Sequence, residues 1–337
     1  MRRRELPTEY HATAPMRLDF AGGWTDVPPF SAREGGVVVN GAIGLRAHVD
    51  LQLGGKLLRL VSKELGETLE CVNSGGLIGA GKLPLLTAAL RMFPVLGGFT
   101  LTTRNDAPSG SGLGSSGALG VALVGALTRA RQDVIGQQDI ADQAWQVETI
   151  EAQLPGGKQD QYGAALGGFH RLSFRDPDVG IEPVTLDPAF AAALERQMLV
   201  CYTNKSRVSG ATISRVMSAY ERGDAKVTGA LRALRDVGDA MVEALRAADL
   251  ARVAALLSEN WKHQQALDPG MRTQEMAQLE DAVAQAGSLG GKAAGAGAGG
   301  SMFFVMKGAA RDAAPAVRAA GAKVLPLAWS AEGVRAW

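Results

Sequence analysis

Cysteine, histidine and aromatic residues are scarce in this sequence, and net charge is almost absent. Two cysteines in 337 residues, Cys71 and Cys201, are too few for a disulfide framework or a thiolate metal site. The 35 Lys and Arg residues nearly balance 34 Asp and Glu residues, leaving a net charge of +1. This balance gives no electrostatic basis for binding nucleic acid or an anionic membrane, so we expect neither partner.

Long hydrophobic runs and histidine clusters are also missing. No stretch reaches the ~18 apolar residues of a membrane span. The basic residues at 2–4 precede Glu5 rather than an apolar segment, so we expect no signal peptide and predict a cytoplasmic protein. The histidines show no metal-ligand spacing, and no Ser-His-Asp or Cys-His arrangement is visible (His11, His48, His170 and His263).

The length and composition indicate a folded protein with two domains. Apolar residues make up 46% of the chain and charged residues 20%, as in ordinary globular proteins. The chain is roughly twice the ~150-residue prior for one domain. Residues 176–188 carry four acidic residues and three prolines, which is typical of a linker. We therefore predict domains at 1–180 and 181–337.

Hydrophobic periodicity predicts an α+β fold. In the first half we expect paired strands within 36–52 and further strands within 57–72, at 99–104 and at 169–174. Helical periodicity follows at 115–131 and 137–152. In the second half we expect strands at 197–202, 302–306 and 323–328, with helices at 211–222, 227–248, 250–265, 273–286 and 309–320.

A glycine- and serine-rich segment lies between the strand at 99–104 and the helix at 115–131. Helix N-termini present unpaired N–H groups, and glycine lets phosphate oxygens approach the backbone, so the segment has the form of a phosphate cradle. A flexible loop with a serine N-cap is the alternative. A P-loop is excluded because Gly114 is followed by Ser115 instead of lysine. A dinucleotide fingerprint is excluded because residues 105–109 separate the strand from the glycines.

The run Pro-Ser-Gly-Ser-Gly-Leu-Gly-Ser-Ser at 108–116 resembles the Pro-x-Gly-x-Gly-Leu-Gly-Ser-Ser motif of the GHMP kinases. The resemblance implies that ATP phosphates bind there and that Ser116 and Glu148 hold Mg²⁺, which prefers oxygen ligands. Glu148 as an ordinary surface residue of its helix remains the alternative. The implied phosphate-binding residues are Pro108, Gly110, Ser111, Gly112, Leu113, Gly114, Ser115 and Ser116.

Two further segments resemble motifs of the same family. Residues 155–168 resemble the catalytic-Asp segment, in which Asp160 would accept the proton of the acceptor hydroxyl or orient that hydroxyl. Residues 14–26 resemble the first motif, in which Arg17 would keep Asp160 ionised and stabilise the transferring charge. A simple turn role for Asp160 stays open.

The resemblance also implies a substrate site. Asp26 matches the acid that binds sugar hydroxyls in sugar kinases, and a turn-capping role is its alternative. Residues 295–300 resemble the third motif, with Ala298 in place of a usual glycine. The implied substrate-binding residues are Gly23, Trp24, Thr25, Asp26, Gly157, Lys158, Asp160, Lys205, Arg207 and Gly297.

Residues 20–30 and 156–162 look like the D-glycero-D-manno-heptose 7-phosphate kinases and the L-fucokinases, which phosphorylate an anomeric hydroxyl. Residues 202–207 favour the heptose branch, whereas Trp24 and residues 267–270 favour fucokinases. The implied fold has an N-terminal ribosomal S5 domain 2-like domain and a C-terminal ferredoxin-like domain. ATP, Mg²⁺ and a sugar or sugar phosphate are the implied ligands, and a homodimer is possible.

A regulator or decarboxylase on the same fold is a different class of function. A protein that only binds its ligand needs neither a metal pair nor a catalytic acid. Arg17, Ser116, Glu148 and Asp160 together therefore argue for an active kinase.

Overall fold

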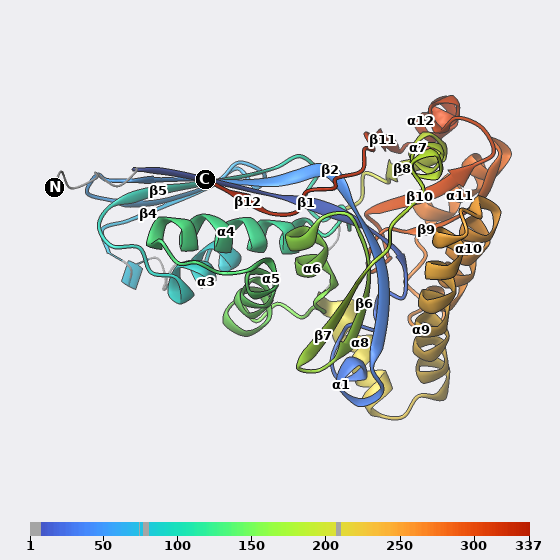
Figure 1. Cartoon of the computed structure of the whole chain (residues 1–337), viewed down its shortest axis with the longest axis horizontal. Helices are drawn as coiled ribbons and strands as arrows, with labels where there is room; N and C mark the ends of the chain where they lie inside the picture. Colours follow the sequence, from blue (N-terminus) through green and yellow to red (C-terminus); the bar gives the residue numbers. More distant parts are fainter. Residues whose placement is uncertain (1–7, 74, 77–80, 207–209) are drawn as a thin grey trace.

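The computed structural model describes residues 8–73, 75–76, 81–206 and 210–337. It contains two β-sheets with helices packed on them, as Figure 1 shows, and the mixed α+β architecture expected from the sequence is confirmed. No described helix is both long and apolar enough to cross a membrane.

The larger sheet has eight strands and is mostly antiparallel. Its main path runs β12-β1-β2-β5-β3-β4, with β6 beside β2 and β7 beside β6. Among the described strands, β3 and β5 alone pair in parallel. The bounds are β1 (Glu9–Ala21), β2 (Gly36–Leu53), β3 (Leu58–Ser62), β4 (Glu67–Cys71), β5 (Phe99–Asn105), β6 (Phe169–Arg175), β7 (Asp178–Pro183) and β12 (Arg335–Ala336).

Helices line one side of this sheet, with α1 at its end (Figure 1). The buried helix α4 packs on β1 and β2 and supplies small side chains that allow close approach. The bounds are α1 (Phe30–Glu34), α3 (Pro84–Met92), α4 (Ser115–Arg131), α5 (Gln137–Gln146), a π-helical segment η1 (Val147–Glu151) and α6 (Gln159–Leu166).

The prediction of paired strands within 36–52 is wrong, because β2 is one continuous strand of 18 residues. Its first eight residues are buried on both faces, and the rest alternate between buried and exposed positions. The change from continuous to alternating hydrophobicity therefore marks a change in what covers the strand. It does not mark a turn.

The smaller sheet is antiparallel in the order β11-β8-β10-β9. Numbered along the chain, this order is 4-1-3-2, the ferredoxin-like arrangement that was expected. Its strands are β8 (Met198–Tyr202), β9 (Ser288–Ala293), β10 (Ser301–Met306) and β11 (Lys323–Leu325). The accompanying helices are α7 (Pro188–Gln197), α8 (Gly210–Glu221), α9 (Ala225–Arg246), α10 (Leu250–Gln265), α11 (Gln274–Gln285), the 3₁₀ turn η2 (Ala310–Ala313) and α12 (Ala314–Ala319).

The end of the chain returns to the larger sheet. Strand β12 pairs with β1, and the backbone N–H of Trp337 donates to the carbonyl of His11 at 3.0 Å. Figure 1 accordingly places the C-terminus on the larger sheet. The expected segment 181–337 thus contains residues of both sheets, and a division near residue 180 stays a prediction.

Candidate active site

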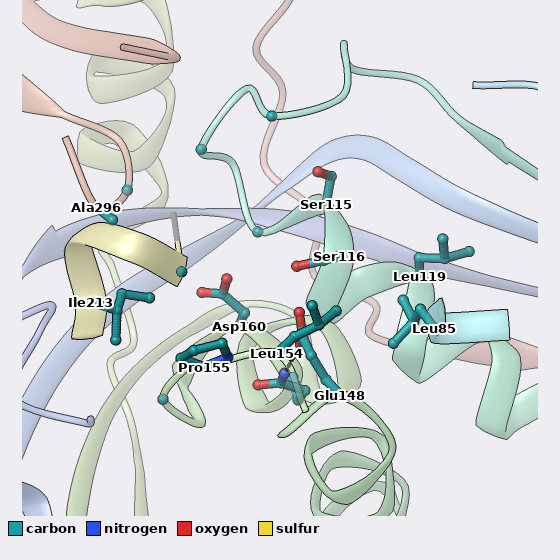
Figure 2. Close-up of a pocket in the computed structure, with 18 of the residues that line it drawn as sticks. Leu85, Ser115, Ser116, Leu119, Glu148, Leu154, Pro155, Asp160, Ile213 and Ala296 are labelled. Carbon is teal, nitrogen blue, oxygen red and sulfur yellow. Dashed lines mark hydrogen bonds between the residues drawn. The ribbon is translucent and has the colours of Figure 1, made fainter. Parts of the chain in front are cut away.

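One cavity of about 420 Å³ opens where the motif segments meet. Arg17, Ser116, Glu148 and Asp160 all line it, although they are separated by up to 143 positions in the sequence. Figure 2 shows Asp160, Ser116 and Glu148 together, with Leu85 on one side and Ile213 on the other. The cavity therefore receives residues from helices of both halves of the chain.

The loop between β5 and α4 has the backbone of an anion cradle. Three of its glycines lie in the left-handed region, Gly110 with φ 69°, Gly112 with φ 77° and Gly114 with φ 76°, where other residues are strained. Ser115 and Ser116 follow in the first turn of α4 and line the cavity. A helix N-terminus that faces a cavity can hold phosphate oxygens through its free N–H groups.

The same loop contacts residues 295–301, which include the segment that resembles the third motif. The N–H of Ser301 donates to the carbonyl of Ser111 at 2.7 Å. A Cβ at Gly295 would lie 2.5 Å from the carbonyl oxygen of Gly112, so only glycine fits there. Ser111 and Leu113 are buried supports of the loop, and the carbonyl of Pro108 accepts from the N–H of Ser111 at 3.2 Å.

Glu148 lies in the π-helical segment that continues α5. Such segments carry an extra residue per turn and often re-aim a side chain at a functional site. Gln161 Nε2 donates to Glu148 Oε2 at 2.5 Å, and Ser116 also hydrogen-bonds to this carboxylate. Burial raises the pKa of Glu148 to about 7, against the effect of the Ser116 hydrogen bond, and the charge of Asp160 adds to the increase.

These surroundings fit a bound divalent cation. A carboxylate with a raised pKa, beside a serine hydroxyl and a second acid, is stabilised in its ionised form by a positive charge. Among the described residues, no three His, Cys, Asp or Glu side chains gather into a metal site. Mg²⁺ suits such a sparse site because it keeps waters and takes further ligands from phosphates.

Arg17, which is buried, forms an ion pair in the cavity with Asp160, whose side chain is 26% exposed. Arg17 Nε and Nη2 both approach Asp160 Oδ1, at 2.8 Å and 2.5 Å. Arg17 Nη1 donates to the carbonyls of Gly112 at 2.8 Å and Ala294 at 3.0 Å. No donor from the described residues reaches Asp160 Oδ2, so this oxygen can accept a hydrogen bond from a ligand.

Asp26 also lines the cavity, and Gln159 and Gly157 pack against its carboxylate. Its Oδ2 accepts from the backbone N–H of Gln159 at 3.1 Å, and its Oδ1 from Gln159 Nε2 at 3.3 Å. A Cβ at Gly157 would overlap its carboxylate. Burial raises the pKa of Asp26 to about 7, and the charges of Asp160 and Asp19 add to it against the Gln159 hydrogen bond.

Three more candidates for substrate binding lie in the turn that follows β1. Gly23 and Trp24 line the cavity, and Trp24 has a left-handed φ of 82°. Thr25 does not line the cavity: its Oγ1 donates to the carbonyl of Gly22 in the same turn at 2.7 Å and to that of Val37 in β2 at 3.0 Å.

Three other candidates do not line the cavity, and one is not described. Lys158 Nζ donates to the carbonyl of Pro177 at 2.9 Å, outside the cavity lining. Lys205 is exposed and pairs with Glu275 at 3.3 Å. Gly297 packs on Met271, and its neighbours Gly295 and Ala296 line the cavity instead. Arg207 lies outside the described residues.

Several cavity residues were not singled out from the sequence. Gln159 and Gln161 flank Asp160, so their place in that motif was an available signal. Five leucines line the cavity, and Figure 2 shows Leu85 and Leu119 together on the side away from Ile213. We call these leucines, together with the polar residues Ser62, Glu64 and Asn105 of the same lining, the leucine slot (Leu65, Leu83, Leu85, Leu86 and Leu119). Local periodicity does not reveal this slot, because it is assembled from β3, β5, α3 and α4 and the segments beside them.

Two family descriptions match the chain. GHMP kinases N terminal domain matches residues 84–168, and GHMP kinases C terminal matches residues 241–323. The chain belongs to the GHMP kinases. The first match covers the phosphate loop, Glu148 and Asp160, and the second covers the glycine segment after β9. GHMP kinases use ATP as the phosphate donor, so the prediction of an ATP-dependent kinase is confirmed.

Some named relatives of this GHMP kinase match nearly the whole length of the chain. It is 29% identical to the D-glycero-alpha-D-manno-heptose 7-phosphate kinase of Campylobacter jejuni, over 96% of this chain and 97% of that protein. A crystal structure of a D-glycero-D-manno-heptose 1-phosphate kinase from Bacteroides thetaiotaomicron superposes with a TM-score of 0.78, at 25% identity, covering 97% of this chain and 98% of that one.

A second group of relatives carries a different name. The bifunctional fucokinase/GDP-fucose pyrophosphorylase of Arabidopsis thaliana is 27% identical over 90% of this chain. The match spans only 30% of that longer protein.

Proposed function

We propose that this GHMP kinase transfers the γ-phosphoryl group of MgATP to a hydroxyl of D-glycero-D-manno-heptose 7-phosphate, at the anomeric carbon. The observation that carries the proposal is the meeting of the phosphate loop, the Ser116–Glu148 pair and the Arg17–Asp160 pair in one cavity. Phosphoryl transfer needs mainly positioning and charge stabilisation, and these groups supply both.

The nucleotide would enter with its base in the leucine slot and its phosphates at the start of α4. The leucines of this slot suit a flat base, and Ser62, Glu64 and Asn105 in the same lining would hydrogen-bond its edge. The glycine backbone and the helix N-terminus of α4 then face the β- and γ-phosphates. Ser116 and Glu148 would hold Mg²⁺, which would neutralise charge on the transferring group.

Asp160 would orient the acceptor hydroxyl or take its proton. Asp160 Oδ2 is available for this role, because Arg17 Nε and Nη2 both contact Oδ1. Arg17 also lies beside the phosphate loop through Gly112, so its charge would stabilise the phosphoryl group during transfer. Asp26 and the turn at Gly23 and Trp24 would bind the other sugar hydroxyls.

The relatives support a phosphorylated heptose over a free sugar. Those named for heptose phosphates match this chain from end to end, whereas the fucokinase relatives match it in part of a longer protein. L-Fucose remains the second candidate for one structural reason. Among the described residues that line the cavity, Arg17 is the only Lys or Arg, and it is already paired with Asp160. The phosphate of a heptose phosphate would therefore need another cation, for which Lys205 and Arg207 are candidates.

A panel of acceptors tests the proposal. ADP release is measured by a coupled assay with four acceptors: heptose 7-phosphate, heptose 1-phosphate, the unphosphorylated heptose and L-fucose. NMR then identifies the carbon that carries the new phosphate in each product. We expect the highest kcat/KM with heptose 7-phosphate. Arg207→Ala should raise the KM for that acceptor by roughly 10- to 100-fold, as expected for one charged hydrogen bond, and leave unphosphorylated sugars unaffected. A preference for L-fucose with a silent Arg207→Ala would move the assignment to fucokinase.

A further inference from the structure

A lysine with no exposed surface lies directly behind the cavity. Lys292, in β9, is 0% exposed, which is unusual for an ammonium group. Its Nζ donates to the backbone carbonyl of Asp19 at 2.6 Å and to Asp19 Oδ2 at 2.9 Å, and it lies 5.6 Å from the centre of the Phe303 ring. A buried charge persists only when it is paired in this way, and the pair joins β9 of the smaller sheet to β1 of the larger one.

Asp19 is held in place by this lysine. The Asp19 side chain is 3% exposed, and its Oδ1 has no hydrogen-bond donor from the described residues. A Cβ at Gly23 would overlap its Oδ2, so the turn that follows β1 closes tightly over the carboxylate. Little room is left for any other arrangement of Asp19 and Lys292.

The next contact along both strands involves Arg17. Arg17 and Asp19 are two residues apart in β1 and point to the same face, because side chains of a strand alternate. Lys292 and Ala294 are likewise two apart, and the carbonyl of Ala294 accepts from Arg17 Nη1 at 3.0 Å. Two neighbouring contacts therefore fasten β1 to the end of β9, one through the ion pair and one through Arg17.

We propose that Lys292 is a positioning residue, whose ion pair with Asp19 fixes the end of β9 so that Arg17 keeps its orientation toward Asp160. Arg17 has three targets, Asp160, Gly112 and Ala294, and only its guanidinium can reach all of them together. If β9 shifts, the Ala294 carbonyl moves and the two donors aimed at Asp160 Oδ1 move with it. This role deepens the proposed phosphoryl transfer and rests on it.

A double-mutant cycle between Lys292 and Arg17 tests the role. Lys292→Met removes the ion pair, and Arg17→Lys keeps a positive charge but lacks the arm that contacts Ala294. We expect Lys292→Met to lower kcat by roughly 10- to 100-fold in the wild-type background, with the KM for ATP changed less than about threefold. In the Arg17→Lys background the same change should lower kcat by less than about threefold, because coupled residues are not additive.

Arg232→Met is the control for the loss of an ion pair between distant segments, at a more exposed position. The Arg232–Glu34 ion pair, at 2.6 Å, joins α9 to α1, and neither residue lines the cavity. We expect its kcat to equal that of the wild type. An equal loss of kcat from Lys292→Met in both backgrounds would overturn the positioning role. So would an equal loss from Arg232→Met, because both outcomes indicate a general structural effect.

Two further provisions keep the test decisive. If Lys292→Met does not fold, the pair Asp19→Asn/Lys292→Met, which leaves no unpaired buried charge, replaces it in the same cycle. Every protein of the cycle is assayed with the acceptor that gives the highest turnover. If that acceptor is water, the rate of ATP hydrolysis is measured. Wild-type protein that releases no ADP in response to any sugar overturns the proposed function, whereas additivity in the cycle overturns only the role of Lys292.

Discussion

Gly117 is the position where one added methyl group should damage the site most selectively. It lies in the first turn of α4, against the start of α6. A Cβ at this position would lie 2.5 Å from the Cβ of Asp160 and 3.0 Å from its carbonyl carbon. Carbon atoms in good contact lie about 3.5–4.0 Å apart, so Gly117→Ala must separate the two helices by roughly 1 Å.

This displacement acts on turnover more than on folding. A misplacement of about 1 Å near the reacting atoms costs on the order of 100-fold in rate. Overpacking costs about 1–3 kcal/mol of stability, and alanine in a helix returns up to about 1 kcal/mol relative to glycine. We therefore expect kcat to fall roughly 100-fold in a protein that still folds.

Gly120→Ala provides the control on the same helix. A Cβ there would lie 3.6 Å from the Cβ of Ala144, which is an ordinary contact. We expect unchanged kcat and a slightly raised melting temperature. Both variants are compared by coupled ADP release and by thermal unfolding. Wild-type kcat in Gly117→Ala, or equal losses in both variants, would refute the packing of Asp160 on α4.

Other predictions concern the two carboxylates and the serine. Asp160→Asn should lower kcat by about 10²–10⁴-fold and leave the Kd of MgATP nearly unchanged, and near-wild-type turnover would exclude Asp160 as base or orienter. Ser116→Ala should raise the Mg²⁺ concentration needed for half-maximal rate, which a metal titration measures. The pKa of Glu148 is raised from 4.5 to about 7 in the folded chain, so the folded state binds more protons between these values and loses stability as pH rises. Glu148→Gln should therefore raise the melting temperature of the metal-free protein more at pH 8 than at pH 5; equal shifts would contradict the raised pKa.

Much of the local structure follows from the sequence because local preferences encode it. The helix expected at 115–131 has those bounds in the structure, since glycines precede it and its small apolar residues all suit burial. The strand expected at 197–202 is β8, one residue shorter. By contrast β1, β9 and α6 were not predicted. Strand β1 carries residues of the first motif and β9 carries glycines, so neither shows a clear alternation of apolar and polar residues. Helix α6 is short and has glycines on both sides.

The sequence by itself determined the family, through short motifs whose glycine and acid spacing reflects the chemistry of a phosphate cradle. Only the tertiary structure decided which side chains reach the cavity. Lys158, inside a motif, turns away to Pro177, whereas Lys292, outside the residues singled out, pairs with Asp19 from 273 positions away. Backbone conformation depends on neighbours in sequence, but the partner of a buried charge depends on how two sheets pack, which no local pattern specifies.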